Sequence, residues 1–146
     1  TPLTMKEGTF HHIVPIQIRF NDTDQLEHVN NSVYQQYYDL GRLDYFEDVL
    51  HEHMNWEVEG LVMASITIDF LVSIRLFDKI EVRSKIYEIG NKSIKMRQEI
   101  FNHTTGVIAS TSKSVMVNFS NSENTTKPVP SKWRDKIIAF EKDLTF

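Results

Sequence analysis

The sequence predicts an α+β domain, in which one long and largely apolar helix lies across the concave face of a curved antiparallel sheet of about five strands. Five stretches alternate with the period of two that strands require, and one stretch repeats apolar residues at spacings of three and four. Short turn signals separate the last three alternating stretches, which favours an antiparallel meander. With 146 residues, we expect a single domain spanning 1–146.

The first two elements are a strand and the long helix, joined by an acidic loop. Residues 12–20 alternate, and Pro15 lacks a backbone N–H, which places this part of the strand at a sheet edge or at the strand's start. The helix is expected to begin near Asn31 or Ser32, both good N-caps, and to end at about residues 49–53.

The remaining strands follow a polar segment after the helix. They are expected at residues 61–74, 79–89, 93–102 and 107–119, and a short C-terminal helix is expected at roughly 131–142. Gly41, in the middle of the long helix, costs about 1 kcal/mol relative to alanine, so we expect the helix to approach the sheet closely there. Such a sheet leaves an open edge and an uncovered face, which favours a dimer.

Composition excludes several kinds of chemistry. The absence of cysteine excludes disulfides, thiolate metal sites and a cysteine nucleophile. A net charge of −4 argues against non-specific nucleic-acid binding. No apolar run approaches the ~20 residues needed to cross a bilayer, and residues 1–9 lack the apolar core of a signal peptide. We therefore expect a soluble cytoplasmic protein.

The loop before the helix has the composition of a reaction site. Asp24 lies four residues before His28 and seven before Asn31, whose backbone N–H would point outward at the positive end of a helix dipole. That N–H could polarise a carbonyl, while Asp24 activates water or attacks the carbonyl itself and His28 orients the substrate or water. These groups suit acyl transfer to water.

Structural interpretations of the same residues stay open. Asp22 and Asp24 can be turn residues that bond local backbone, His28 can be structural, and Asn30 with Asn31 can be a capping pair. A calcium site does not fit, because Leu26 stands where a third ligand belongs. A zinc site would need another ligand, so we expect no metal.

A wider pattern of motifs spans nearly the whole chain: Arg19-Phe20, Asp22-Thr23-Asp24, His28-Val29-Asn30-Asn31, Tyr34, Tyr37, Gly41-Arg42, Ile68-Asp69-Phe70, Asp78 to Val82 and Lys127 to Pro130. This pattern resembles the hotdog-fold acyl thioesterases, in particular the 4-hydroxybenzoyl-CoA thioesterase-like group and the acyl-acyl-carrier-protein thioesterases. The resemblance implies a hotdog fold, Asp24 as the catalytic carboxylate and the Asn31 N–H as the carbonyl-polarising group. It also implies a dimer or tetramer with active sites at the dimer interface.

The resemblance further implies substrate contacts. Asn30 and Tyr34 belong to the matching motif, and CoA is expected near the turn that holds Lys92 and Ser93. Two positions depart from the pattern: Leu26 replaces the asparagine of the carrier-protein branch, and Glu27 stands where many relatives carry glycine.

We therefore predict an acyl-CoA thioester hydrolase that needs no cofactor. The alternatives are an acyl-acyl-carrier-protein thioesterase and a non-catalytic acyl-CoA-binding module on the same fold. A hotdog dehydratase would need a differently placed Asp/His pair.

Overall fold

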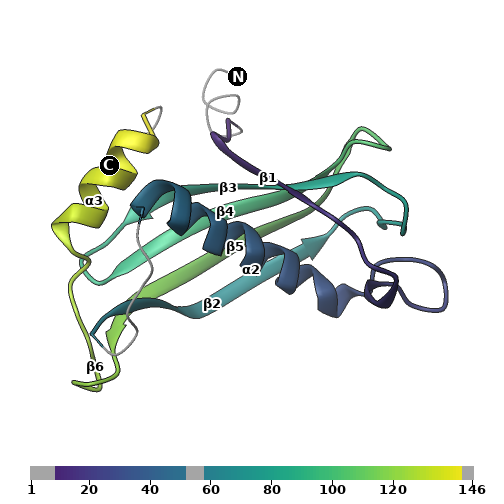
Figure 1. The fold of residues 1–146 in the computed structure, drawn as a ribbon. Helices are drawn as coiled ribbons and strands as arrows, with labels where there is room; N and C mark the ends of the chain where they lie inside the picture. The colour runs from purple at the N-terminus through teal and green to yellow at the C-terminus, as the bar shows by residue number, and fades with distance from the viewer. Residues whose placement is uncertain (1–8, 52–57, 143–146) are drawn as a thin grey trace.

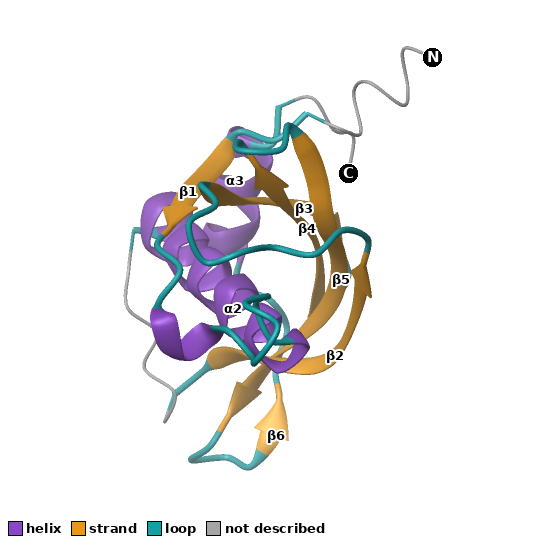
Figure 2. Cartoon of the chain, turned by 90° about the vertical axis from the view of Figure 1, so that its right-hand side faces the viewer, coloured by secondary structure: helices purple, strands orange, loops and turns teal. Residues whose placement is uncertain are grey.

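The computed structural model describes residues 9–51 and 58–142, and it has one antiparallel sheet with one long helix against it (Figure 1). The sheet order is β1-β3-β4-β5-β2, and the short β6 pairs antiparallel with the last two residues of β5. Figure 2 shows the sheet curled around the helix, which confirms the predicted hotdog arrangement. The strands are β1 (His12–Ile16), β2 (Gly60–Phe70), β3 (Ile80–Ile89), β4 (Ser93–Asn102), β5 (Val107–Ser120) and β6 (Thr125–Thr126).

The long helix is one continuous helical run with irregular ends. A 3₁₀ turn, η2 (Asn31–Val33), leads into α2 (Tyr34–Tyr45), and a π turn, η3 (Phe46–Leu50), ends the run. His51 follows in the left-handed conformation that commonly stops helices (φ 56°). The predicted helix end at 49–53 reaches residues outside those described, but within them the helix stops at residue 50.

Gly41 marks the closest approach of α2 to the sheet. A Cβ atom at this position would lie 2.5 Å from Cγ1 of Val82 on β3, which is closer than real Cβ contacts. The predicted close approach is thereby confirmed, and it explains why the helix tolerates a residue of poor helix propensity.

Gly41→Ala is expected to lower the free energy of unfolding by about 1–3 kcal/mol. The clash with Val82 outweighs the helix-propensity gain of about 1 kcal/mol. Urea denaturation measures the difference, with the exposed Gln35→Ala on the same helix as the control that should stay within about 0.5 kcal/mol of wild type. A more stable Gly41→Ala variant would mean that the helix can move off the sheet at little cost.

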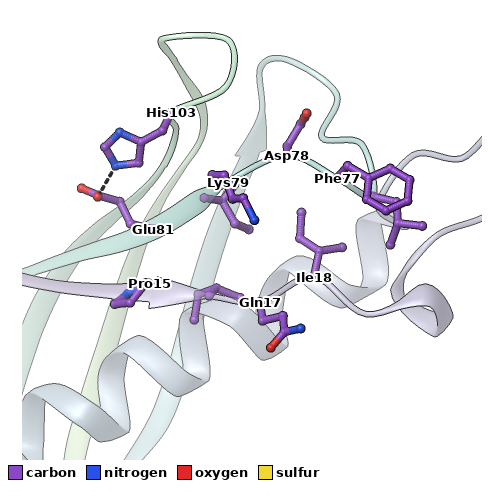
Figure 3. A pocket seen from close by; sticks show the side chains of 11 residues that line it. Pro15, Gln17, Ile18, Phe77, Asp78, Lys79, Glu81 and His103 are labelled. Carbon is purple, nitrogen blue, oxygen red and sulfur yellow. Dashed lines mark hydrogen bonds and ion pairs between the residues drawn. The ribbon is translucent and has the colours of Figure 1, made fainter.

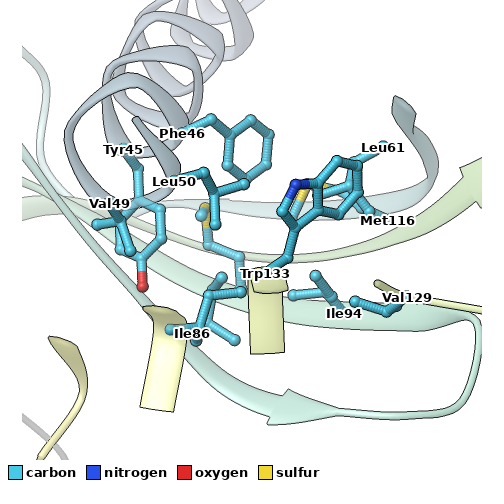
Figure 4. Close-up of a cluster of buried hydrophobic side chains, with 12 residues drawn as sticks. Tyr45, Phe46, Val49, Leu50, Leu61, Ile86, Ile94, Met116, Val129 and Trp133 are labelled. Carbon is cyan, nitrogen blue, oxygen red and sulfur yellow. The ribbon is translucent and has the colours of Figure 1, made fainter. Parts of the chain in front are cut away.

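The core divides into two clusters along the helix. One lies where the C-terminal helix α3 (Ser131–Phe140) packs near the end of the helical run, with Trp133 buried among residues of η3 and the sheet (Figure 4). The other lies beneath the first turns of α2 and includes Val29 and Tyr34. The second cluster therefore supports the acidic loop that precedes the helix.

Four predicted boundaries need correction. The first strand ends at Ile16 rather than residue 20, because its ladder with β3 stops where Ile16 pairs with Ile80. The second strand ends at Phe70 rather than residue 74, since the N–H groups of residues 71 and 72 both bond the carbonyl of Ala109. The helical run begins at Asn31 as predicted, but its N-cap is Asn30 rather than Asn31 or Ser32, and α3 ends at residue 140 instead of 142.

Both outer strands are edges of the sheet. β1 pairs only with β3 among the described residues, which confirms the edge position that Pro15 predicts. β2 pairs only with β5 there, and large apolar side chains at its far end are exposed, namely Phe70, Leu71 and Val72. No helix in the described residues is long and apolar enough to cross a membrane.

Candidate active site

The acidic loop is held against the connection between β2 and β3. Isolated bridges join Thr23 to Val29 within the loop and His28 to Arg75 across it. The Val29 N–H also donates to the Ile74 carbonyl oxygen at 2.7 Å. Backbone contacts alone therefore close the loop on itself and hold it against the β2–β3 connection.

Asp22 is the structural acid of the pair. Its side chain is 3% exposed, and Oδ2 accepts the Tyr37 hydroxyl at 2.7 Å and the Arg19 N–H at 3.0 Å. The Arg19 guanidinium donates to Oδ1 at 3.2 Å. Burial tends to raise the pKa of Asp22, but these hydrogen bonds and the Arg19 charge together lower it below its ordinary value. Asp22 thus stays a charged anchor of the loop.

Asp24 combines the turn role with an available oxygen. Its Oδ1 accepts the backbone N–H groups of Leu26 at 2.9 Å and His28 at 3.3 Å, which is the turn interpretation of the sequence. Oδ2 accepts no hydrogen bond from any described residue. Asp24 is also exposed, so this oxygen remains available to a ligand or a water.

The start of the helix offers an unpaired donor. Asn30 caps the helix by accepting the Ser32 N–H at 3.0 Å, and its own N–H donates to the Asp22 carbonyl oxygen at 2.8 Å. The Asn31 N–H donates to no atom of the described residues. Because a helical run to residue 50 follows it, this N–H carries the partial positive charge of the dipole.

Glu27 has a backbone conformation that favours glycine. Its φ is 63°, in the left-handed region, where a side chain beyond glycine is strained. This conformation explains why glycine would suit this position in the family that the sequence resembles, since glycine adopts a positive φ without strain. In this chain Glu27 adopts this conformation and lines a neighbouring cavity that Asp24 also lines.

One cavity collects most of the predicted site residues. Asp24, His28, Asn31 and Tyr34 line a cavity of about 270 Å³, together with residues at the end of β2, namely Phe70, Leu71, Val72 and Ser73. Tyr34 is buried and packs edge-to-face on Phe70 at 4.9 Å between ring centroids. Burial raises the pKa of its hydroxyl, against the effect of a hydrogen bond with the Ile74 backbone, so Tyr34 serves as a neutral wall.

The other predicted contacts lie elsewhere in the chain. Asn30 adjoins the cavity, but its side chain is committed to the cap. Lys92 lies in the turn after β3 and Ser93 begins β4, at the end of the sheet opposite to the acidic loop. The ten residues of β3 span roughly 30 Å, so within one chain these two residues do not join the site.

The β2–β3 connection contributes residues that the sequence analysis did not single out. A neighbouring cavity of about 850 Å³ also has Asp24 in its wall, beside Phe20, Arg75 and Phe77. Phe77 is 87% exposed and belongs as well to a third cavity of about 650 Å³, where His103 bonds Glu81 (Figure 3). The sequence shows Phe77 two residues after Arg75, but only the fold places both residues beside Asp24.

One group of described residues has the ligand types of a metal site. The ligand atoms of His12, Asp44 and Asp48 lie within 4.8 Å of one another, between β1 and the helical run. His12 Nε2 lies 2.9 Å from Asp44 Oδ2 and 3.4 Å from Asp48 Oδ2. These contacts fasten the edge strand to the helix, and we assign the trio that structural role. The acidic loop forms no such group in the described residues.

Known proteins resemble this chain in sequence over most of its length. The sequence pattern of the Thioesterase-like superfamily matches residues 18–137. A chloroplastic acyl-acyl carrier protein thioesterase of Arabidopsis thaliana is 27% identical over 131 residues, which cover 88% of this chain and 68% of that protein.

Solved structures with the same architecture span nearly the whole chain. A Thermus thermophilus thioesterase complexed with coenzyme A and Zn matches with a TM-score of 0.79 at 28% identity, over 92% of this chain and 97% of that one. A 1,4-dihydroxy-2-naphthoyl-CoA thioesterase from Synechocystis, with a TM-score of 0.78 at 19% identity over 89% and 96% of the two chains, shares the fold.

Proposed function

Because this chain belongs to the Thioesterase-like superfamily, we propose that it is a hydrolase that cleaves an acyl thioester of CoA into a free carboxylic acid and CoA. A single cavity lined by both Asp24 and Asn31 supports this activity most directly. One group can activate a nucleophile and the other can stabilise the charge that develops on the thioester oxygen. The CoA-bound thioesterase of similar structure supports CoA, rather than an acyl carrier protein, as the group that carries the acyl chain.

In the proposed reaction the thioester carbonyl oxygen accepts the Asn31 N–H. Asp24 then either takes a proton from a water that attacks the carbonyl carbon, or attacks that carbon itself and is released by water. In both routes a tetrahedral intermediate collapses, the carbon–sulfur bond breaks and the CoA thiolate takes up a proton. His28, on the same cavity wall, orients the water or the thioester.

We further propose that a second copy of this chain completes the site. The free edge of β2 is long, and its exposed apolar residues include Val62 and Phe70. A two-fold axis through the middle of two such edges would pair them antiparallel. Phe70 of one subunit would then lie beside Gly60 of the partner subunit. In each chain Gly60 pairs with Phe119, at the sheet end that also holds Lys92 and Ser93. The partner subunit's Lys92 would thereby reach the Asp24 cavity.

Lys92→Ala is expected to raise KM for acyl-CoA by about 5–10-fold with little change in kcat, because a charged hydrogen bond to a CoA phosphate is lost. Lys113→Ala, an exposed lysine in the middle of β5, is the matched control. Sedimentation of the wild-type protein should show a dimer or a tetramer. A fully active monomer would show that neither the partner subunit nor its Lys92 contributes to the site.

A screen of thioesters tests the proposed activity. The chain has no cysteine, so a thiol reagent detects only the thiol released from substrate. Short, long and aromatic acyl-CoAs form one arm, and acyl-acyl-carrier-protein forms the other because of the Arabidopsis relative. Thiol release from acyl-CoA supports the proposal, release only from the carrier protein favours the second function, and binding without release identifies a non-catalytic module.

A further inference from the structure

We propose that Tyr37 is a positioning residue for thioester hydrolysis, because its hydroxyl, acting through Asp22, holds the Asp24 loop in place against the start of the helix. This inference rests on the proposed function of the Asp24 cavity. Tyr37 does not line that cavity, so its effect on the reaction would be indirect.

The first step is the contact between Tyr37 and Asp22. Tyr37 lies in the first turn of α2, and its hydroxyl donates to Asp22 Oδ2 at 2.7 Å with both side chains buried. The other donors to this carboxylate come from Arg19, in the same short turn as Asp22. Within the described residues, Tyr37 is thus the single donor from the helix to the Asp22 carboxylate.

The second step leads from Asp22 to the proposed catalytic groups. Its carbonyl oxygen accepts the Asn30 N–H at 2.8 Å, directly before the Asn31 amide, and Asp24 follows two residues later. Asp22 therefore joins the strand side of the loop to its helix side. If the helix no longer holds the carboxylate, the Asp22 end of the loop is held by backbone bonds and by its own turn.

The consequence for the reaction follows from the geometry that hydrolysis needs. A displacement of about 1 Å between reacting groups can cost on the order of 10²-fold in rate. Tyr37→Phe keeps the ring and its packing but removes the hydroxyl. It is expected to lower kcat by about 10-fold to 100-fold and to leave KM within about twofold of wild type.

The chain offers a matched control in Tyr45. This tyrosine lies on the same helix, is buried, and donates its hydroxyl to the buried carboxylate of Glu141 at 2.6 Å. It belongs to the other core cluster, beside α3. Tyr45→Phe removes the same kind of hydrogen bond far from the cavity, so it should lower Tm comparably and leave kcat at the wild-type value.

Two measurements separate positioning from general loosening of the structure. In an Asp24→Asn background, Tyr37→Phe should lower the residual rate several-fold less than in wild type, because the group that it positions is already gone. Amide hydrogen exchange gives a readout without substrate: the Asn30 N–H should exchange faster in Tyr37→Phe than in Tyr45→Phe.

These outcomes also separate this inference from the proposed function. A wild-type protein without thioesterase activity defeats the proposed function, whereas the exchange rate of the Asn30 amide still decides whether Tyr37 holds the loop. Equal kcat values for Tyr37→Phe and Tyr45→Phe in an active enzyme would overturn the positioning role. Equal Asn30 exchange rates in the two variants would overturn it as well.

Discussion

Asp24→Asn is expected to lower kcat for acyl-CoA hydrolysis by about 10²–10⁴-fold. The side-chain amide keeps an oxygen that can accept the Leu26 and His28 N–H groups, so the turn survives. The negative charge and the proton-accepting oxygen are lost, and with them both proposed routes to the tetrahedral intermediate. Stopped assays of thiol release, run at enzyme concentrations high enough to see a rate 10⁴-fold lower, measure the effect.

The matched control for this variant is Asp135→Asn, an exposed aspartate on α3 outside the three cavities. Both proteins should unfold within a few degrees of wild type, because neither charge is buried. An Asp24→Asn enzyme that retains wild-type kcat would place the catalytic base elsewhere. His28, on the same cavity wall, would then be the next residue to replace, whereas a smaller loss for His28→Ala than for Asp24→Asn is expected under the present proposal.

Asn31→Pro is expected to lower kcat by about 10²–10³-fold, the usual cost of removing one donor to a developing oxyanion. Proline has no N–H, so the substitution removes the proposed donor itself and not merely a side chain. The position suits proline: it is the first residue of the helical run, and Asn30 before it is extended (φ −64°, ψ 136°). The Ser32 N–H keeps its cap on Asn30. Circular dichroism and Tm should therefore stay close to wild type.

Asn31→Ala is the comparison that isolates the backbone group, because it removes the side chain and keeps the N–H. The ratio of kcat between Asn31→Ala and Asn31→Pro measures the amide alone. A ratio near one, with both proteins folded, would show that the thioester oxygen is stabilised by another donor. Since KM reflects contacts made in the ground state as well, the decisive quantity is kcat under saturating acyl-CoA.

Hydrophobic periodicity predicted which strands and helices form but did not predict where they end. Alternation continues through residues 17–20, yet the strand stops at Ile16 because the ladder with β3 begins only at Ile80. Phe20 consequently lies exposed beside the cavities. The capping residue is Asn30 because Asn30 is extended and its side chain accepts the Ser32 N–H. The end of the strand depends on a partner that is distant in the sequence, whereas the cap depends on a local choice between neighbouring polar residues.

The candidate site shows the same division between local and distant information. Asp24, His28, Asn31 and Tyr34 are close in sequence, and the structure gathers them in one cavity. Lys92 and Ser93 were assigned by resemblance, and only the topology shows that they lie at the opposite end of the sheet. Arg75 and Phe77 become neighbours of Asp24 through the bridge between His28 and Arg75, which no periodicity in the sequence indicates.

The two backbone hydrogen bonds on Asp24 Oδ1 restrict rotation of this carboxylate about its Cβ–Cγ bond. A carboxylate restricted in this way presents Oδ2 preferentially to an incoming molecule, and part of the entropy of orienting it is lost when the protein folds rather than at each turnover. Discrimination between acyl chains must then come from the shape of the surrounding walls. We therefore expect substitutions at Leu71, which lines this cavity but carries no proposed catalytic group, to change the chain-length preference.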